Sequence, residues 1–189
     1  MKDFIGMYDN AISSEQCKQI IEHFENFNVY DTKENEYRKD ERECDTVGLT
    51  FTKPIHEPSN HILGQTLHKY TPKYIEMCPE LNDVGKFALF YGFNLQRYKP
   101  NQCYWRPHAE NDGNNLDRLL AWTFYLNTVT DGGGTRYTQY DRTIDAVEGR
   151  LVIWPAYWTH FHHGVVSKTQ TKYIATGWFT YTQRKVNVK

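Results

Sequence analysis

Histidine and acidic side chains gather in two segments of the second half of the chain, and a lysine follows them. The residues of interest are His108, Glu110, His160, His162, His163 and Lys172. Two imidazoles and one carboxylate on one face of a metal ion form the ligand set of non-haem Fe(II) sites, which leaves coordination positions open for substrate and O2. Lys172 would add a cation for an anionic molecule bound beside the metal.

The first segment holds His108 and Glu110, two positions apart. Positions i and i+2 of a β-strand face the same way, so we expect both side chains to reach one point. Asp112 is an alternative carboxylate, although Asn111-Asp112-Gly113 is typical of a turn. A His-x-Glu pair also occurs by chance in many chains, so by itself it is weak evidence for a metal.

The second segment offers three histidines, His160, His162 and His163, in a run typical of a strand. His160 and His162 would share one face of that strand, and His163 would lie on the other. Each of them taken alone is more often a structural residue than a ligand. Residue types and spacing therefore predict a metal site but leave the third ligand open.

The composition indicates a single domain with almost no net charge. The chain has 189 residues, a formal net charge of −1 and a pI near 6.7, so bulk charge gives no reason to expect nucleic acid or an anionic membrane as a partner. No apolar run approaches the ~20 residues of a membrane span, and the four cysteines include no Cys-x-x-Cys pair. We therefore expect one domain over residues 1–189, free thiols and a cytoplasmic location. The sequence does not determine the oligomeric state.

Two N-terminal segments have helical periodicity. Ser13 and Gln16 form a capping-box signature in front of an amphipathic helix predicted over residues 14–27. Apolar residues recur at helical spacing again over residues 57–77, interrupted by Thr71-Pro72. Thr71 as N-cap with a proline at the first helical position would start a new helix there. We therefore expect either two abutting helices or one kinked helix.

The hydrophobic period changes from helical to two at Phe87. Alternation continues to Gln96, and turn signals rich in Gly, Asn and Asp then separate short aromatic and β-branched runs. These runs cover residues 103–108, 118–126, 143–147, 150–154, 159–163 and 172–181. Many short antiparallel strands preceded by helices predict an α+β, mainly β fold. We expect a double-stranded β-helix (jelly roll) core over about residues 85–182, supported by N-terminal helices within about residues 1–80.

The order of these motifs resembles that of Fe(II)/2-oxoglutarate-dependent dioxygenases of the prolyl 4-hydroxylase type, especially the compact bacterial and phage members. The motifs are Tyr98, His108-x-Glu110, Arg118, Tyr125-Leu126-Asn127, Gly133-Gly134-Thr135, Gly149-Arg150-Leu151-Val152, His162, Lys172 and Gly177-Trp178. The resemblance implies that His108, Glu110 and His162 hold the iron. His162 is preferred because the family keeps a basic residue at the spacing that separates it from Lys172. Glu110 stands where the family usually has Asp, one methylene shorter.

The same resemblance implies a co-substrate pocket. 2-Oxoglutarate would chelate the iron through its 1-carboxylate and 2-keto oxygen, and Lys172 would hold the far carboxylate. Tyr125 corresponds to a tyrosine whose hydroxyl joins that lysine, Tyr98 to a tyrosine nearer the metal, and Trp178 to an aromatic residue of the same cavity. Each tyrosine would otherwise be a core aromatic, and the lysine would otherwise be an exposed strand end. Arg118 is expected near the entrance, without a catalytic role.

The implied reaction is hydroxylation of a substrate carbon by O2, with 2-oxoglutarate converted to succinate and CO2. The favoured substrate is a peptidyl proline in a peptide or protein, with ascorbate as an additional reductant. Two alternatives stay open: the same chemistry on a small molecule or nucleobase, and a non-catalytic, cupin-like metal-binding module. Lys172 argues against the second alternative, because a structural metal site needs no cation beyond its ligands.

Overall fold

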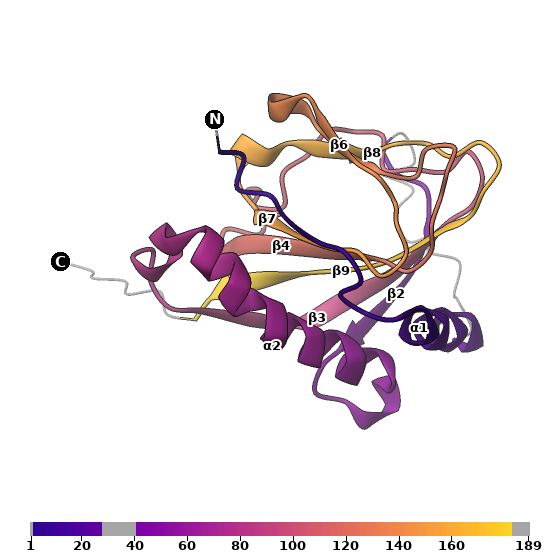
Figure 1. Cartoon of the computed structure of the whole chain (residues 1–189), viewed down its shortest axis with the longest axis horizontal. Coiled ribbons are helices and arrows are strands. Elements are labelled where there is room, and N and C mark those ends of the chain that lie inside the picture. The colour runs from indigo at the N-terminus through magenta and orange to yellow at the C-terminus, as the bar shows by residue number, and fades with distance from the viewer. Residues whose placement is uncertain (1, 28–40, 183–189) are drawn as a thin grey trace.

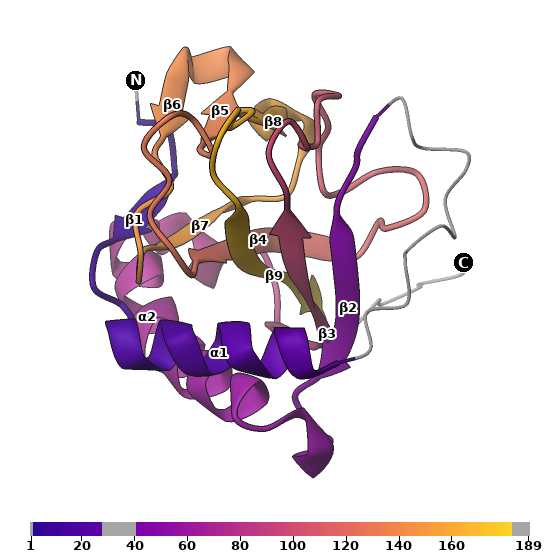
Figure 2. The ribbon, with the colours of Figure 1, turned by 90° about the vertical axis from the view of Figure 1, so that its right-hand side faces the viewer.

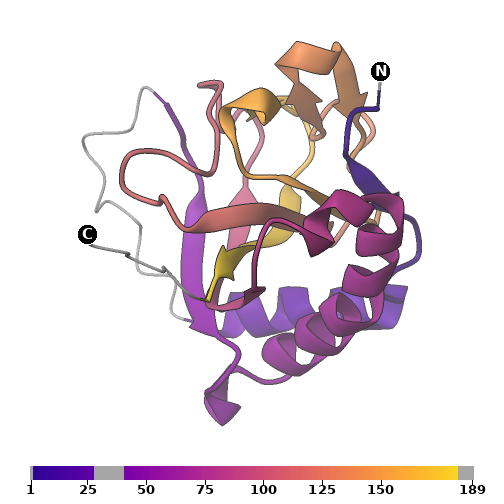
Figure 3. The same ribbon diagram turned by 90° about the vertical axis from the view of Figure 1, so that its left-hand side faces the viewer.

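The computed structural model describes residues 2–27 and 41–182, which form three layers. Helices α1 (Ser14–Asn26) and α2 (Ser59–Met77) lie against one face of a six-stranded sheet (Figure 1). A three-stranded sheet lies over the other face, and the views from either side show the same order of layers (Figures 2 and 3). The space between the two sheets therefore lies on the side of the large sheet away from the helices.

Every strand pair in both sheets is antiparallel. The large sheet has the order β1 (Gly6–Tyr8), β7 (Leu151–Pro155), β4 (Arg118–Tyr125), β9 (Lys172–Tyr181), β3 (Phe87–Tyr98) and β2 (Asp45–Thr50). The small sheet has the order β6 (Arg142–Ile144), β5 (Thr135–Tyr137) and β8 (His162–Gly164). The short 3-10 helices are η2 (Pro54–His56), η3 (Pro79–Asn82), η4 (Thr138–Tyr140) and η5 (Trp158–His160).

The main hydrophobic core lies between the helices and the large sheet. The buried faces of α1 and α2 pack on the alternate strand residues whose side chains lie on the helix-facing side of the large sheet. Its fully buried members include Ile20, Phe24, Leu63, Leu67, Leu95, Trp122, Phe124 and Ile153. The amphipathic helices are thus held by the apolar face that their periodicity predicts.

The strand residues that alternate with these have side chains on the opposite side of the large sheet, in the space between the two sheets. This second cluster includes Tyr98, Ala121, Tyr125, Val152, Trp154 and Ile174. Along β9 the alternation places Lys172, Thr176 and Trp178 on the same face as Ile174. The strand period therefore directs a lysine, a threonine and a tryptophan into one inter-sheet space.

Both predicted helical segments are helical. The capping box is formed, because Gln16 N donates to Ser13 Oγ over 3.2 Å and Ser13 N donates to Gln16 Oε1 over 2.9 Å. The segment predicted over residues 57–77 is one helix that continues through Pro72. The predicted N-cap role of Thr71 is wrong, because its hydroxyl donates to the Leu67 carbonyl within the helix.

Strands β3, β4, β7 and β9 coincide with predicted runs, whereas β1, β2 and β5 were not predicted. β1 and β2 lie within residues 1–80, where only helices were expected. The run over residues 103–108 forms only the isolated bridges Arg42–Tyr104 and His108–His162. Among the described residues, no helix combines the length and apolar character needed to cross a membrane.

Candidate metal and co-substrate site

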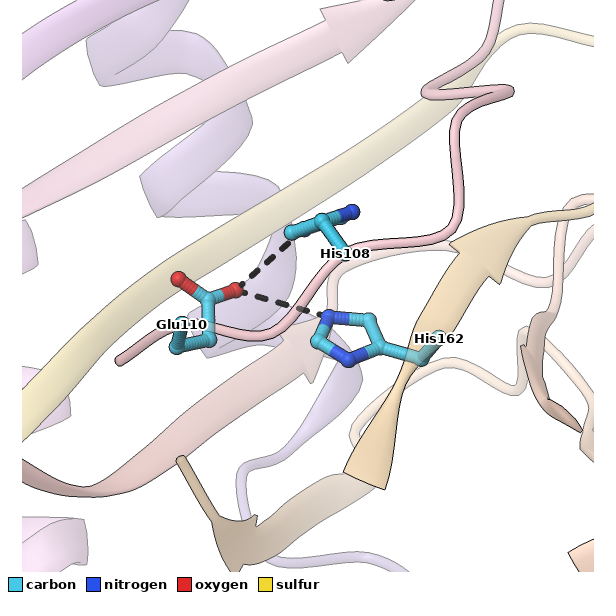
Figure 4. Close-up of side chains that lie close together, drawn as sticks. All are labelled: His108, Glu110 and His162. Atoms are coloured by element: carbon cyan, nitrogen blue, oxygen red, sulfur yellow. Dashed lines mark ion pairs between the residues drawn. The ribbon is translucent and has the colours of Figure 1, made fainter. Parts of the chain in front are cut away.

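His108, Glu110 and His162 converge on one point between the sheets (Figure 4). One ligand atom from each lies within 4.8 Å of the other two. Glu110 Oε1 is 3.6 Å from His108 Nε2 and 3.4 Å from His162 Nε2. Metal ligands at 2.0–2.1 Å and right angles are about 3 Å apart. The two imidazoles and the carboxylate therefore fit a divalent transition-metal ion after small movements.

The backbone that brings these residues together differs from the predicted strand. His108 and His162 exchange two backbone hydrogen bonds, with N–O distances of 3.0 and 2.9 Å, and this isolated bridge ties the two segments together. Glu110 lies in a bend, not on a strand, so the predicted i, i+2 geometry of a strand is wrong. The bend is fixed by the Asn111 N–H, which donates to the Ala156 carbonyl over 2.7 Å.

Hydrogen bonds orient both imidazoles for metal binding. Nδ1 of His108 is 3.0 Å from the Arg106 carbonyl, and Nδ1 of His162 is 2.9 Å from the His160 carbonyl. Because a carbonyl only accepts, each Nδ1 must carry a proton, and Nε2, which faces Glu110, is the atom that would bind a metal in place of its own proton. Stacking of Tyr104 on the His108 ring, at 3.7 Å between centroids, further fixes that ring.

The other two histidines of the C-terminal segment have different surroundings. His160 ends η5, so it does not share a strand face with His162 as predicted. Its buried ring has Nε2 2.8 Å from the Asp3 carbonyl and Nδ1 2.9 Å from Thr159 Oγ1. His163 Nδ1 lies 3.0 Å from the Gly164 carbonyl. Neither histidine belongs to the metal-binding cluster, although the His160 carbonyl orients His162.

The alternative carboxylate, Asp112, has the turn role that its sequence context indicates. Its Oδ1 accepts hydrogen bonds from Asn114 N and Asn115 Nδ2 at 2.9 and 2.8 Å. Burial works against the ionised form, but these hydrogen bonds outweigh it and lower the pKa of Asp112. Asp112 lines the cavity that adjoins the three ligands but is not part of the three-residue cluster.

Glu110 is charged despite its burial. Burial alone would raise its pKa, but hydrogen bonds from His108 and His162 and their charges hold the pKa of Glu110 well below its usual value. Its second oxygen, Oε2, accepts a hydrogen bond of 2.8 Å from Trp178 Nε1. Arg118, to which no role was assigned, also contacts Glu110, and its place before a buried strand gave no signal of that contact.

A cavity of about 360 Å³ adjoins the three ligands, and Lys172 lies in its wall. Lys172 is only 6% exposed, and Nζ lies 4.4 Å from the centroid of the Tyr98 ring. Burial lowers the pKa of Lys172 to about 8, and no carboxylate of residues 2–27 or 41–182 forms an ion pair with it. Trp154 also lines the cavity, and its buried indole N–H has no hydrogen-bond partner in the described part of the chain. An ammonium without an ion pair and an N–H without an acceptor among the described residues fit an anionic, oxygen-rich ligand such as 2-oxoglutarate.

The two predicted pocket tyrosines take different positions. Tyr98 lines the cavity, and its hydroxyl donates to Gln96 Oε1 over 2.9 Å. The Tyr125 hydroxyl lies behind the wall, 2.6 Å from Oγ1 of Thr135, and the threonine lines the cavity. Burial raises the pKa of Tyr98 well above its usual value and that of Tyr125 to about 12, so both hydroxyls keep their protons. Their contact with a co-substrate stays a prediction.

Comparison with known sequences supports the family suggested by the motifs. Residues 93–180 match the model of the 2OG-Fe(II) oxygenase superfamily. The chain is 28% identical over 174 residues to a multifunctional procollagen lysine hydroxylase and glycosyltransferase of Caenorhabditis elegans. That alignment covers 89% of this chain but only 23% of the relative. The chain therefore corresponds to less than a quarter of that protein.

Comparison with solved structures shows a shared fold. A viral collagen prolyl hydroxylase from Paramecium bursaria Chlorella virus 1 superposes with a TM-score of 0.70 at 19% identity, over 95% of this chain and 97% of the viral chain. A Trichoplax adhaerens prolyl hydroxylase, solved with a peptide fragment of hypoxia inducible factor, gives 0.68 at 15% identity, over 95% and 84%. The motif order and the converging ligands agree with the match of residues 93–180 to the 2OG-Fe(II) oxygenase superfamily.

Proposed function

We propose that the protein is a 2-oxoglutarate-dependent non-haem iron dioxygenase that hydroxylates a substrate carbon. The observation that carries this proposal is the placement of His108, Glu110 and His162 in one cavity with Lys172, a buried lysine without a described counterion. A non-catalytic metal module would gain nothing from that lysine, because burying an unpaired ammonium is costly. The two facing antiparallel sheets support a double-stranded β-helix core, as the fold of the superfamily implies.

Each part of the site has a distinct task in this function. His108, Glu110 and His162 would hold Fe(II), which supplies the redox chemistry with O2 that no amino-acid side chain provides. Lys172 would pair with the far carboxylate of 2-oxoglutarate and thereby fix its direction in the cavity. Buried Ile174 and Trp154 contribute apolar surface to the wall of that cavity. In the balanced reaction, one oxygen atom of O2 enters the substrate C–H bond and the other enters succinate, with loss of CO2.

The substrate that we favour is a proline in a peptide or protein. The neighbours with the same fold include prolyl hydroxylases, one of them bound to a peptide, and the aromatic residue Tyr104 lines the cavity. A peptidyl lysine is the second candidate, because the sequence relatives are procollagen lysine hydroxylases. The four cysteines, all of which lie in the described part of the chain, form no disulfide, which supports the proposal of a reducing, cytoplasmic location, where ascorbate or a similar reductant would keep iron ferrous.

Two measurements test the function and the substrate separately. Purified protein is incubated with Fe(II), ascorbate and 2-oxoglutarate, and succinate is quantified with and without a library of proline-containing and lysine-containing peptides. We expect Fe(II)-dependent succinate that rises with prolyl peptides, and mass spectrometry should find a product heavier by one oxygen atom. Succinate release without stimulation by any peptide would retain the oxygenase but reject the peptide substrate. Absence of Fe(II)-dependent succinate in all mixtures would reject the oxygenase itself.

A further inference from the structure

The oxygen of Glu110 that faces away from both histidines is held by two side chains from neighbouring strands. Trp178 Nε1 donates to Oε2 over 2.8 Å. Arg118 Nη1 is 3.5 Å from the same oxygen and donates to the Glu110 carbonyl over 3.1 Å. We propose that Trp178 and Arg118 are positioning residues that lock the glutamate so that Oε1 alone is presented to the metal. The proposal rests on the iron site assigned above.

Trp178 and Arg118 also bind each other. The guanidinium carbon of Arg118 lies 3.6 Å from the centroid of the Trp178 ring, which is a close cation–π stack. Antiparallel pairing of β4 and β9 places Arg118 opposite Thr180 and Ala121 opposite Trp178, so both side chains come from the same end of the two strands. The stack fixes the direction of the indole N–H, and the sheet fixes the stack.

These contacts restrict the side chain of Glu110, which is more flexible than the aspartate usual at this position. Glu110 has one more rotatable bond than the usual aspartate, so an unrestrained carboxylate could turn away or bind the metal through both oxygens. In the structure, Oε1 lies within 3.6 Å of both histidine Nε2 atoms while Oε2 accepts the hydrogen bond from Trp178. Residues that orient a metal ligand through a hydrogen bond commonly change metal affinity 10–100-fold when they are replaced.

The charge of Arg118 and its positioning role should have opposite effects on metal affinity, so a variant can distinguish them. A guanidinium near the metal repels a cation, so its Coulomb effect alone would weaken metal binding. The positioning role has the opposite effect, because Arg118 holds the carboxylate ligand in place. Arg118→Lys keeps the positive charge but loses the planar stack and the two-atom contact. Weaker metal binding by this variant therefore reports positioning and not charge.

The experiment measures Mn(II) affinity by the EPR signal of the free ion, without 2-oxoglutarate or substrate, so that turnover plays no part. We expect Trp178→Phe, which keeps the ring and loses the N–H, to weaken Mn(II) binding about tenfold or more. Arg118→Lys should weaken it in the same direction. Trp158→Phe is the control, because Trp158 is 73% exposed, and it should bind within about twofold of the parent.

Testing Trp178→Phe again in a protein that also carries Glu110→Asp separates loss of carboxylate orientation from a general disturbance of the site. The shorter side chain of Glu110→Asp cannot reach Trp178 and both histidines together, so Trp178→Phe in this background should cost less than about threefold. Equal losses in both backgrounds would overturn the proposal, as would Trp178→Phe binding within twofold of the parent. If the parent itself binds no Mn(II), the iron site and the proposed function fail together, which is a different result from an unaffected variant.

Discussion

Protonation of Lys172 should set the pH range in which 2-oxoglutarate binds. Burial lowers the pKa of this lysine to about 8 from 10.5, so its charge is lost as pH rises through 8 and not through 10.5. At pH 7 roughly nine-tenths of the molecules carry the ammonium, and at pH 9 roughly one-tenth do. If the far carboxylate requires that ammonium, the apparent dissociation constant should rise about tenfold between these two values.

The assay is a calorimetric titration of the Mn(II)-loaded protein with 2-oxoglutarate at pH 7, 8 and 9. Mn(II) supports binding without turnover, and both carboxylates of 2-oxoglutarate are ionised over the whole range. Lys172→Arg is the matched control, because a guanidinium stays charged and should make binding independent of pH. Lys172→Met should weaken binding by about 3 kcal/mol, roughly two orders of magnitude, because one partner of a buried ion pair is removed.

Two results would refute this reasoning. Affinity that stays constant from pH 7 to 9 in the parent and is unchanged in Lys172→Met would show that the charge of Lys172 is not used. A tenfold loss that persists in Lys172→Arg would show that another group titrates, such as a metal-bound water. In either case the far carboxylate of 2-oxoglutarate must be bound elsewhere in the cavity.

Three further predictions concern the ligands and the stability of the fold. His162→Ala should abolish Mn(II) binding and succinate release with an unchanged circular dichroism spectrum, whereas His163→Ala should retain both; equal behaviour of the two variants would contradict the ligand assignment. Lys172→Met should stabilise the metal-free protein by about 2 kcal/mol at pH 7, because burying the ammonium costs stability below pH 8. That gain should shrink as pH rises from 8 to 10.5, and urea unfolding at both ends of this range checks it. Ser13→Ala should cost about 1 kcal/mol of unfolding free energy, because the Gln16 N–H loses its acceptor; an unchanged urea midpoint would argue against the capping box.

Local patterns predicted the parts of the fold that local physics controls. The Ser13–Gln16 capping box and the helical period produced α1 as expected. The period of two produced β3 and β9, and it also explains why Lys172 and Trp178 face the same space. β1 and β2 were not predicted, because three and six residues with modest apolar content become strands only when a neighbouring strand supplies their hydrogen bonds.

The site shows the same division. Residue types and the spacing from His162 to Lys172 pointed to the metal and the co-substrate, and these residues do lie in one cavity. The geometry that joins them was wrong in the prediction, because Glu110 lies in a bend and His108 meets His162 through an isolated bridge. No sequence spacing indicates such a bridge, since it pairs two segments that are distant in the chain.

The sequence by itself determined which groups could bind a metal ion and a carboxylate co-substrate. Two imidazoles and a carboxylate suit the metal, an ammonium suits the co-substrate, and their order is typical of one superfamily. Tertiary structure alone decided that His160 is directed to the Asp3 carbonyl, away from the cluster, and that Arg118 and Trp178 hold the far oxygen of Glu110. The physical reason is range. Periodicity and capping act over a few residues, whereas a side chain's partners across a sheet depend on strand register, which is fixed only when the whole core packs.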